Sequence, residues 1–301
     1  MSIQKIAIVS DTGIALPDHI SYEKSFVQDG KPVCISSQGL FLVPHTININ
    51  GKEYYDQINI STSQMVEFMT KFPKKNYLTS APSPSRFLET FIQVPKRYTS
   101  ILCIPMSSKL SASYSAAQVA VNEAKKMSSI HKITLVDSEA ATGNLGLLVL
   151  RLQEIANQGG SITHLFNAIK EMNLSLSMLG YLDKMYYVWR SGRIPKIVYM
   201  ASSILGIKPI FRMFQNNISV ASKVRTKKRG MERLTSLIKN EVGDTGLNVL
   251  VLYGKSRVDG LKLADLVRNR LNIKSIEVGR FNATTIAHSG PDILGIAYYK
   301  Y

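Results

Sequence analysis

His288 is the side chain in this sequence with the clearest chemical potential. It lies in Ile286-Ala287-His288-Ser289-Gly290-Pro291, which we expect to form a turn before the last apolar strand, over residues 293–298. Functional residues concentrate on turns, and an imidazole can donate or accept hydrogen bonds near neutral pH. An imidazole in this position is suited to hold an anion such as a carboxylate.

A hydroxyl-rich segment far upstream could meet the same anion. Thr79-Ser80-Ala81-Pro82-Ser83-Pro84-Ser85 leads into a helix, for which Ser83 followed by Pro84 makes a good cap. A cap uses one hydroxyl, so Thr79 and Ser80 remain available for a ligand. Plain helix capping is the alternative interpretation of this segment.

A second hydroxyl-rich turn contains Ser107 and Ser108 and joins an apolar strand to another helix. Backbone N–H groups and short hydroxyls at such junctions can hold a negative head group. We therefore expect both turns to face an anion beside His288, with ordinary turn chemistry as the alternative for each turn alone.

The elements that must position these groups follow an α/β pattern in the first half. Short apolar strands over residues 5–10, 99–106 and 132–136 alternate with helical patterns over residues 112–127 and 144–157. This alternation predicts a doubly wound parallel sheet, with ligands at the carboxyl ends of its strands. Asn50-Gly51 between extended segments predicts a β-ribbon insertion.

The second half has a different pattern and predicts a C-terminal α+β lobe. Its expected elements are strands over residues 175–181, 208–214, 246–253 and 275–278, and helices over residues 183–191, 229–241 and 260–271. We place the boundary near Met172, which gives an N-terminal α/β lobe of residues 1–172 and a C-terminal lobe of residues 173–301. A chain of 301 residues with 45% hydrophobic residues can bury a core large enough for two lobes.

The charge balance favours acidic partners. The chain carries 37 Lys and Arg against 21 Asp and Glu, a net charge of +16, which speeds encounter with anions. Arg193 and the stretch with Arg225, Lys227 and Lys228 could hold a phosphate or an acidic partner, although a solvated surface is the simpler interpretation. No aromatic residues alternate with these basic residues, so we expect no nucleic-acid binding. A basic nucleic-acid-binding protein is kept as an alternative function.

Several other classes of protein find no support in the sequence. Cys34 and Cys103 are far apart and signal neither a disulfide framework nor a metal site, so we expect no metal and a reducing cytoplasm. No apolar segment approaches the ~20 residues of a membrane helix. Gly254-Lys255-Ser256 ends like a phosphate-binding loop but lacks the first glycine, and we expect no cofactor.

A serine hydrolase acting on a lipid or ester is a further alternative. Ser107 or Ser108 as nucleophile, His288 as base and Asp11 or Asp137 as its partner would complete a triad. The Gly-x-Ser-x-Gly turn that exposes the nucleophile of many hydrolases is absent.

Taken together in this order, the segments resemble the DegV family of fatty-acid-binding proteins over nearly the whole chain. The resemblance rests on Ile8-Val9-Ser10-Asp11-Thr12, Thr79-Ser80-Ala81-Pro82-Ser83-Pro84, Ser107-Ser108-Lys109-Leu110-Ser111, Val136-Asp137-Ser138, Ser191-Gly192-Arg193-Ile194, Leu205-Gly206-Ile207-Lys208-Pro209-Ile210, Lys223-Val224-Arg225-Thr226-Lys227-Lys228 and His288-Ser289-Gly290-Pro291. The chain departs from the usual family pattern at Ala81, at Ala112-Ser113 and at Asp292, each of which adjoins a site loop.

The resemblance implies a two-lobed protein that buries one long-chain fatty acid between its lobes. Thr79, Ser108 and His288 would then hold the carboxylate, with Ser80 and Ser107 beside them. It also implies a non-enzymatic role: a separate ATP-dependent fatty acid kinase phosphorylates the bound acid for phospholipid synthesis. The expected partners are thus the fatty acid, the kinase and, transiently, a membrane surface.

Overall fold

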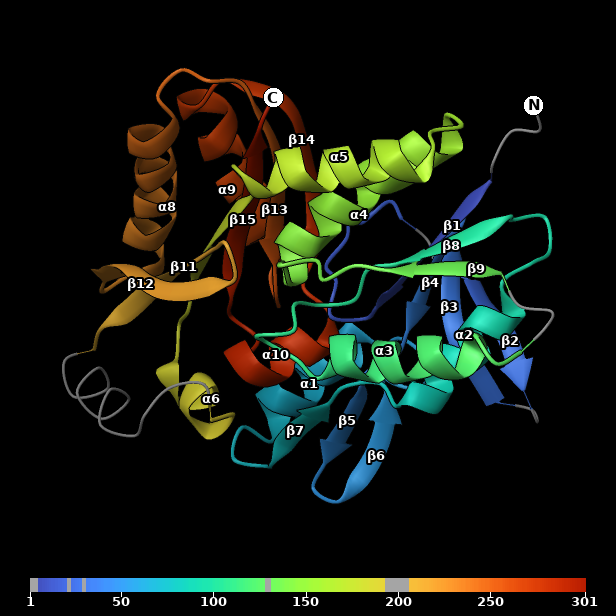
Figure 1. Ribbon diagram of the computed structural model, residues 1–301. Helices are drawn as coiled ribbons and strands as arrows, with labels where there is room; N and C mark the ends of the chain where they lie inside the picture. The colour runs from blue at the N-terminus through green and yellow to red at the C-terminus, as the bar shows by residue number, and fades with distance from the viewer. Residues whose placement is uncertain (1–4, 21–22, 29–30, 128–130, 193–205) are drawn as a thin grey trace.

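A six-stranded sheet forms the centre of the N-terminal half. The computed structural model describes residues 5–20, 23–28, 31–127, 131–192 and 206–301 (Figure 1). The sheet has the order β2 (Glu23–Gln28), β3 (Lys31–Ser37), β4 (Leu40–Val43), β1 (Ile6–Asp11), β8 (Ser100–Cys103) and β9 (Lys132–Leu135). Strands β1, β8 and β9 are parallel, as predicted. Strand β4, which was expected to belong to the β-ribbon, instead pairs parallel with β1, and β3 pairs antiparallel with β2 and β4.

Helices cover both faces of this sheet, which explains why its central strands β4, β1 and β8 are buried throughout. Ala7 and Val9 of β1 pack in one cluster with Phe87 and Phe91 of α2 (Pro84–Gln93), to which α3 (Ser113–Ala124) also contributes. On the other side, Ile6 and Ile8 pack in a cluster that includes α4 (Thr142–Asn157) and α5 (Ile162–Asn173). The doubly wound architecture predicted for the first half is confirmed.

The β-ribbon insertion is confirmed and forms a small sheet of its own. Strands β5 (Thr46–Ile49) and β6 (Lys52–Tyr55) make a hairpin through Asn50-Gly51, where both residues have positive φ, 56° and 92°. Strand β7 (Tyr77–Ser80) pairs with β5 on its other edge. Helix α1 (Thr62–Lys71) connects β6 to β7. We call these three strands the insertion sheet.

The second six-stranded sheet is mixed, as an α+β lobe requires. Its order is β12 (Asn217–Val224), β11 (Lys208–Phe214), β10 (Ser177–Tyr181), β15 (Leu294–Lys300), β13 (Leu247–Tyr253) and β14 (Ile273–Arg280). Only β13 and β14 pair in parallel among these described strands. The described helices of this half are α6 (Met185–Arg190), α8 (Lys227–Val242), α9 (Arg257–Arg270) and α10 (Ala283–Ser289). The boundary at residues 172 and 173 stays a prediction.

Three sequence-based assignments need correction. His288 lies in the last turn of α10 rather than in an open turn, and Thr79 and Ser80 end strand β7 rather than beginning a loop. Strand β12 was not predicted. The residues of α10 include two β-branched threonines with modest helix propensity, so tertiary packing of Ala283, Ile286 and Ala287 in the core stabilises this helix instead.

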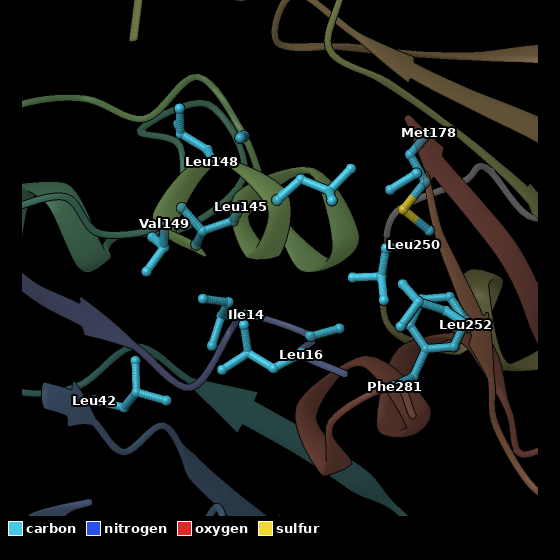
Figure 2. Packing of buried hydrophobic residues seen from close by; sticks show 14 of the residues in the cluster. Ile14, Leu16, Leu42, Leu145, Leu148, Val149, Met178, Leu250, Leu252 and Phe281 are labelled. Carbon is cyan, nitrogen blue, oxygen red and sulfur yellow. The ribbon is translucent and has the colours of Figure 1, made fainter. Parts of the chain in front are cut away.

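Helix α4 joins the two halves into one hydrophobic core. It packs against β1 of the first sheet and against β10, β13 and β15 of the second, and Figure 1 shows it between the blue and the red strands. In Figure 2, Leu145 and Leu148 of α4 lie above Leu16, and Leu250 and Phe281 lie to its right; all five belong to one buried cluster. In the part of the chain that the structure describes, none of the helices has the length and apolar character needed to span a bilayer.

We predict that Gly146→Ala destabilises the fold even though alanine favours helices over glycine by up to ~1 kcal/mol. A Cβ on Gly146 would lie 2.0 Å from the backbone oxygen of Ala15, where α4 meets the first sheet. Forced overpacking of this kind typically costs about 1–3 kcal/mol. Urea unfolding would measure it against Gly180→Ala, whose added Cβ would have its nearest neighbours at 3.9 Å. Equal stability of the two variants would contradict the prediction.

Candidate functional site

Thr79 and His288, which the sequence placed in different lobes, lie in direct contact. The Oγ1 atom of Thr79 lies 2.6 Å from Nε2 of His288, although the residues are 209 positions apart. Strand β7 presents the hydroxyl and the last turn of α10 presents the imidazole, and both side chains are half-buried. Ser80 lies beside them at the end of β7 and is exposed. This pair provides two hydrogen-bonding groups at one accessible point.

Helix α10 is fixed at its N-terminus by buried polar contacts. Asn282 caps the helix by accepting from the backbone N–H of Thr285 at 2.6 Å, and its amide donates to the carbonyl oxygens of Thr12 and Ile14. Asp56, which follows β6, accepts from the backbone N–H and the hydroxyl of Thr284 at 3.0 and 2.6 Å. These contacts tie the helix that carries His288 to the N-terminal lobe.

The two serines of the second hydroxyl turn have other hydrogen-bond partners. Ser107 is buried and donates to the side-chain oxygen of Asn216, in the turn between β11 and β12. Ser108 is exposed and donates to Asp137, whose other carboxylate oxygen accepts from the Ser108 backbone N–H at 3.2 Å. The turn thus contacts both lobes, and a role for either serine at the Thr79–His288 pair remains a proposal.

A buried polar network that the sequence analysis missed centres on His45. Its Nδ1 lies 3.4 Å from Thr12 Oγ1 and 3.9 Å from a carboxylate oxygen of Asp11, while its Nε2 lies 3.4 Å from Ser113 Oγ. Asp11 also accepts from the backbone N–H groups of Gly13 and Met106. All four side chains are at most 2% exposed. The network therefore stabilises the ends of β1 and β5 and cannot receive an external substrate.

The serine, histidine and aspartate residues expected for a hydrolase do not form a catalytic triad in the structure. Ser107 and Ser108 contact Asn216 and Asp137, and His288 contacts Thr79. The Ser113, His45 and Asp11 set has the residue types of a triad but is enclosed in the core. A nucleophile must be activated by a base and reach its substrate, and neither set meets both conditions.

The described residues contain no metal ligand set, and the thiol of Cys103 is not in its reactive form. Residues 5–20, 23–28, 31–127, 131–192 and 206–301 contain no group of three or more His, Cys, Asp or Glu that could hold a metal ion. The Cys103 thiol is fully buried, and burial, with the nearby charge of Asp11, raises its pKa well above the ordinary value. A raised pKa disfavours the thiolate, which is the reactive form.

The basic residues singled out in the sequence differ in their surroundings. Arg225 and Lys228 are exposed beside the start of α8. Lys227 is half-buried and forms an ion pair with Asp259 at 2.8 Å, so it contributes to packing between α8 and α9. Arg193 lies outside the described residues. Arg225 and Lys228 are therefore accessible, as are their neighbours Lys223 and Arg229.

A pocket of about 230 Å³ opens between the lobes near the other end of α10. Its apolar lining includes Ile14, Leu16 and Leu42, and its polar lining includes Asn282 and Arg280. The guanidinium of Arg280 donates to Ser63 Oγ at 2.6 Å and to the Gly254 carbonyl at 2.9 Å. The interface between the lobes is thus not filled completely by side chains.

Comparison with known proteins identifies the family. The DegV family, described as a family of uncharacterised proteins, matches residues 5–301. The chain belongs to the DegV family. A DegV domain-containing protein from Caldanaerobacter subterraneus subsp. tengcongensis is 26% identical over 297 residues, which covers 98% of this chain and 99% of that protein.

Solved DegV structures share the fold over the whole chain. A fatty-acid-binding DegV protein from Thermus thermophilus has a TM-score of 0.80 at 21% identity, and covers 99% of this chain and 100% of its own. A stearic-acid-binding protein from Eubacterium ventriosum has a TM-score of 0.81 at 20% identity, covering 99% and 98%. The fatty acid kinase B3 protein of Streptococcus pneumoniae, loaded with linoleic acid, has a TM-score of 0.81 at 19% identity, covering 99% and 100%. These likenesses establish the predicted fold class.

We predict that Asp56→Asn gains stability relative to the unaltered protein as the pH rises. Burial raises the pKa of the Asp56 carboxyl above its ordinary value of 3.8, against hydrogen bonds from Thr284 and the charge of His45, which lower it. Between the unfolded and the folded pKa, the folded protein retains a proton that the unfolded chain has lost. The free energy of unfolding therefore falls as pH rises through that window.

Urea unfolding at a series of pH values from about 4 to 7 would test this, because asparagine lacks the titration. Glu67→Gln, which removes an exposed carboxylate from α1, is the control. Parallel pH profiles for Asp56→Asn and the unaltered protein would show that the raised pKa is wrong.

Proposed function

We propose that this chain binds one long-chain fatty acid between its two lobes and holds the carboxylate with Thr79 and His288. The observation that carries the proposal is the 2.6 Å contact between Thr79 Oγ1 and His288 Nε2. It places a hydroxyl and an imidazole from different lobes at one half-buried point. The DegV proteins of the same fold that bind fatty acids support the ligand class. Ser80, Ser107 and Ser108 are further candidates for the carboxylate.

Apolar contact would supply most of the affinity, and the polar groups would fix the orientation of the ligand. About 14 methylenes at ~0.8 kcal/mol each give on the order of 11 kcal/mol before the costs of ordering are subtracted. A carboxylate leaves water only when it is hydrogen-bonded, because an unpaired buried charge costs several kcal/mol. Thr79 and His288 can provide such bonds.

A long acyl chain needs more room than the pocket between the lobes provides. The pocket measures about 230 Å³, below the ~300–1,000 Å³ of typical ligand sites. Binding would therefore require packed side chains at the interface to separate. Ile14, Leu16 and Leu42 already line the pocket and would give an entering chain an apolar surface.

We further propose that the chain carries the acid to a separate ATP-dependent kinase and performs no chemistry itself. The phosphoryl transfer would then occur on the presented carboxylate, giving an acyl phosphate for phospholipid synthesis. The fatty acid kinase B3 protein of the same fold supports a kinase partner. The exposed Arg225 and Lys228 would attract an acidic surface of that partner.

We expect purified protein to carry a fatty acid that mass spectrometry detects after solvent extraction. Thr79→Val and His288→Ala should each weaken oleate binding about tenfold to a hundredfold, since a hydrogen bond to a charged group contributes ~1.5–3 kcal/mol. His131→Ala is the matched control, because the His131 ring hydrogen-bonds to the Val94 carbonyl at 2.9 Å and lies beside β9. Empty protein that ignores added oleate and palmitate would refute the proposed function.

We expect the double reversal Arg225→Glu with Lys228→Glu to slow acyl phosphate formation by the kinase while oleate binding stays unchanged. Charge reversal opposes electrostatic steering, so the effect should shrink as salt is added. Arg268→Glu, a reversal at an exposed site on α9, is the control. An unchanged rate for the double variant would remove this surface from the kinase interface, and a loss of oleate binding would indicate misfolding instead.

A further inference from the structure

The insertion sheet contacts helix α10 at both of its ends. Asp56 directly follows β6 and contacts Thr284 in the first turn of the helix. Thr79 lies in β7, two strands away, and contacts His288 in the last turn. Helix α10 also packs against α1 and β7. One small sheet therefore determines where both ends of this helix lie.

The Asp56 carboxylate is fully buried, and two of its hydrogen bonds come from this helix. One oxygen accepts two bonds from Thr284, and the other accepts from the Gln57 side chain at 3.0 Å. A negative charge at a helix N-terminus complements the helix dipole. A buried carboxylate is nevertheless a costly way to gain stability, because apolar packing of the same volume is often as favourable. Its specific value lies in the geometry that it imposes.

The backbone of Asp56 extends the same connection toward the buried network. Its N–H donates to the His45 carbonyl at 2.9 Å, and His45 contacts Thr12 and Ser113 through its ring. Asn282, the cap of α10, donates to the Thr12 and Ile14 carbonyls. The helix therefore cannot shift along the insertion sheet without breaking several buried hydrogen bonds.

We propose that Asp56 is a positioning residue for carboxylate binding: it fixes α10 on the insertion sheet so that His288 Nε2 meets Thr79 Oγ1. The inference rests on the proposed function, and it assigns the control of head-group geometry to a residue that does not touch the ligand. Loss of Asp56 releases the N-terminal turn of α10 and leaves Thr284 without its acceptor. The imidazole then no longer lies at a fixed distance from Thr79.

The test compares oleate affinity with the environment of the His288 ring. Asp56→Ala should weaken oleate binding about tenfold and shift the His288 imidazole signals in ¹H–¹⁵N NMR spectra, which are assigned among the five histidines by means of His288→Ala. Asp56→Asn keeps an acceptor for Thr284, so it should restore affinity to within about threefold. Thr284→Val, which removes one of the two donors, should have an intermediate effect.

A stability-matched control separates positioning from general destabilisation. Val267→Ala removes buried volume from α9, whose neighbours are β13, β14 and α8, and it should lower the melting temperature without changing oleate affinity or the His288 signals. If Asp56→Ala behaves like Val267→Ala in both measurements, the inference is wrong. If Asp56→Ala does not fold, unchanged affinity and signals in Thr284→Val overturn it equally. Failure of the unaltered protein to bind oleate would instead reject the proposed function.

Discussion

The buried hydrogen bonds that hold α10 to the N-terminal lobe determine the geometry of the site. Thr79 and His288 are separated by most of the chain, and their contact depends on where a seven-residue helix lies. Such a short helix is marginal alone, so Asp56 and Asn282 fix its first turn. The distance between Thr79 and His288 thus depends on residues at the opposite end of the helix.

Apolar packing and polar anchoring have different roles at the lobe interface. The cluster around α4 removes a large apolar surface from water and supplies most of the free energy that holds the lobes together. Such packing tolerates sliding better than a hydrogen bond does, because it is non-directional. The contacts of Asn282 with the Thr12 and Ile14 carbonyls have defined distances and select one arrangement.

Most strands and helices followed from periodicity, whereas β2, β3, β12 and the partners of the site residues did not. The apolar run of β1 and the Asn50-Gly51 turn predicted their elements because local sequence determines them. Helix α10 escaped prediction because its stability comes from long-range packing. Asp56 gave no signal for the same reason: an aspartate after two tyrosines is an ordinary loop residue until Thr284 lies opposite. The Thr79–His288 pairing was expected, but the serines of the second turn have partners, Asn216 and Asp137, that spacing could not reveal.

The contact between Thr79 and His288 also limits what the head group can contribute to affinity. An incoming carboxylate exchanges this hydrogen bond and its own bonds to water for bonds to the two side chains, so the net gain is small. The exchange still requires the Thr79 hydroxyl and the His288 imidazole to face one point. A carboxylate with a single partner loses its hydration without enough hydrogen bonds to replace it. Affinity for the fatty acid then depends on how much apolar surface of the lobe interface the acyl chain can contact. The placement of the carboxylate depends on α10. This separation lets substitutions in the interface alter chain preference while the anchors preserve the position at which the carboxylate is held.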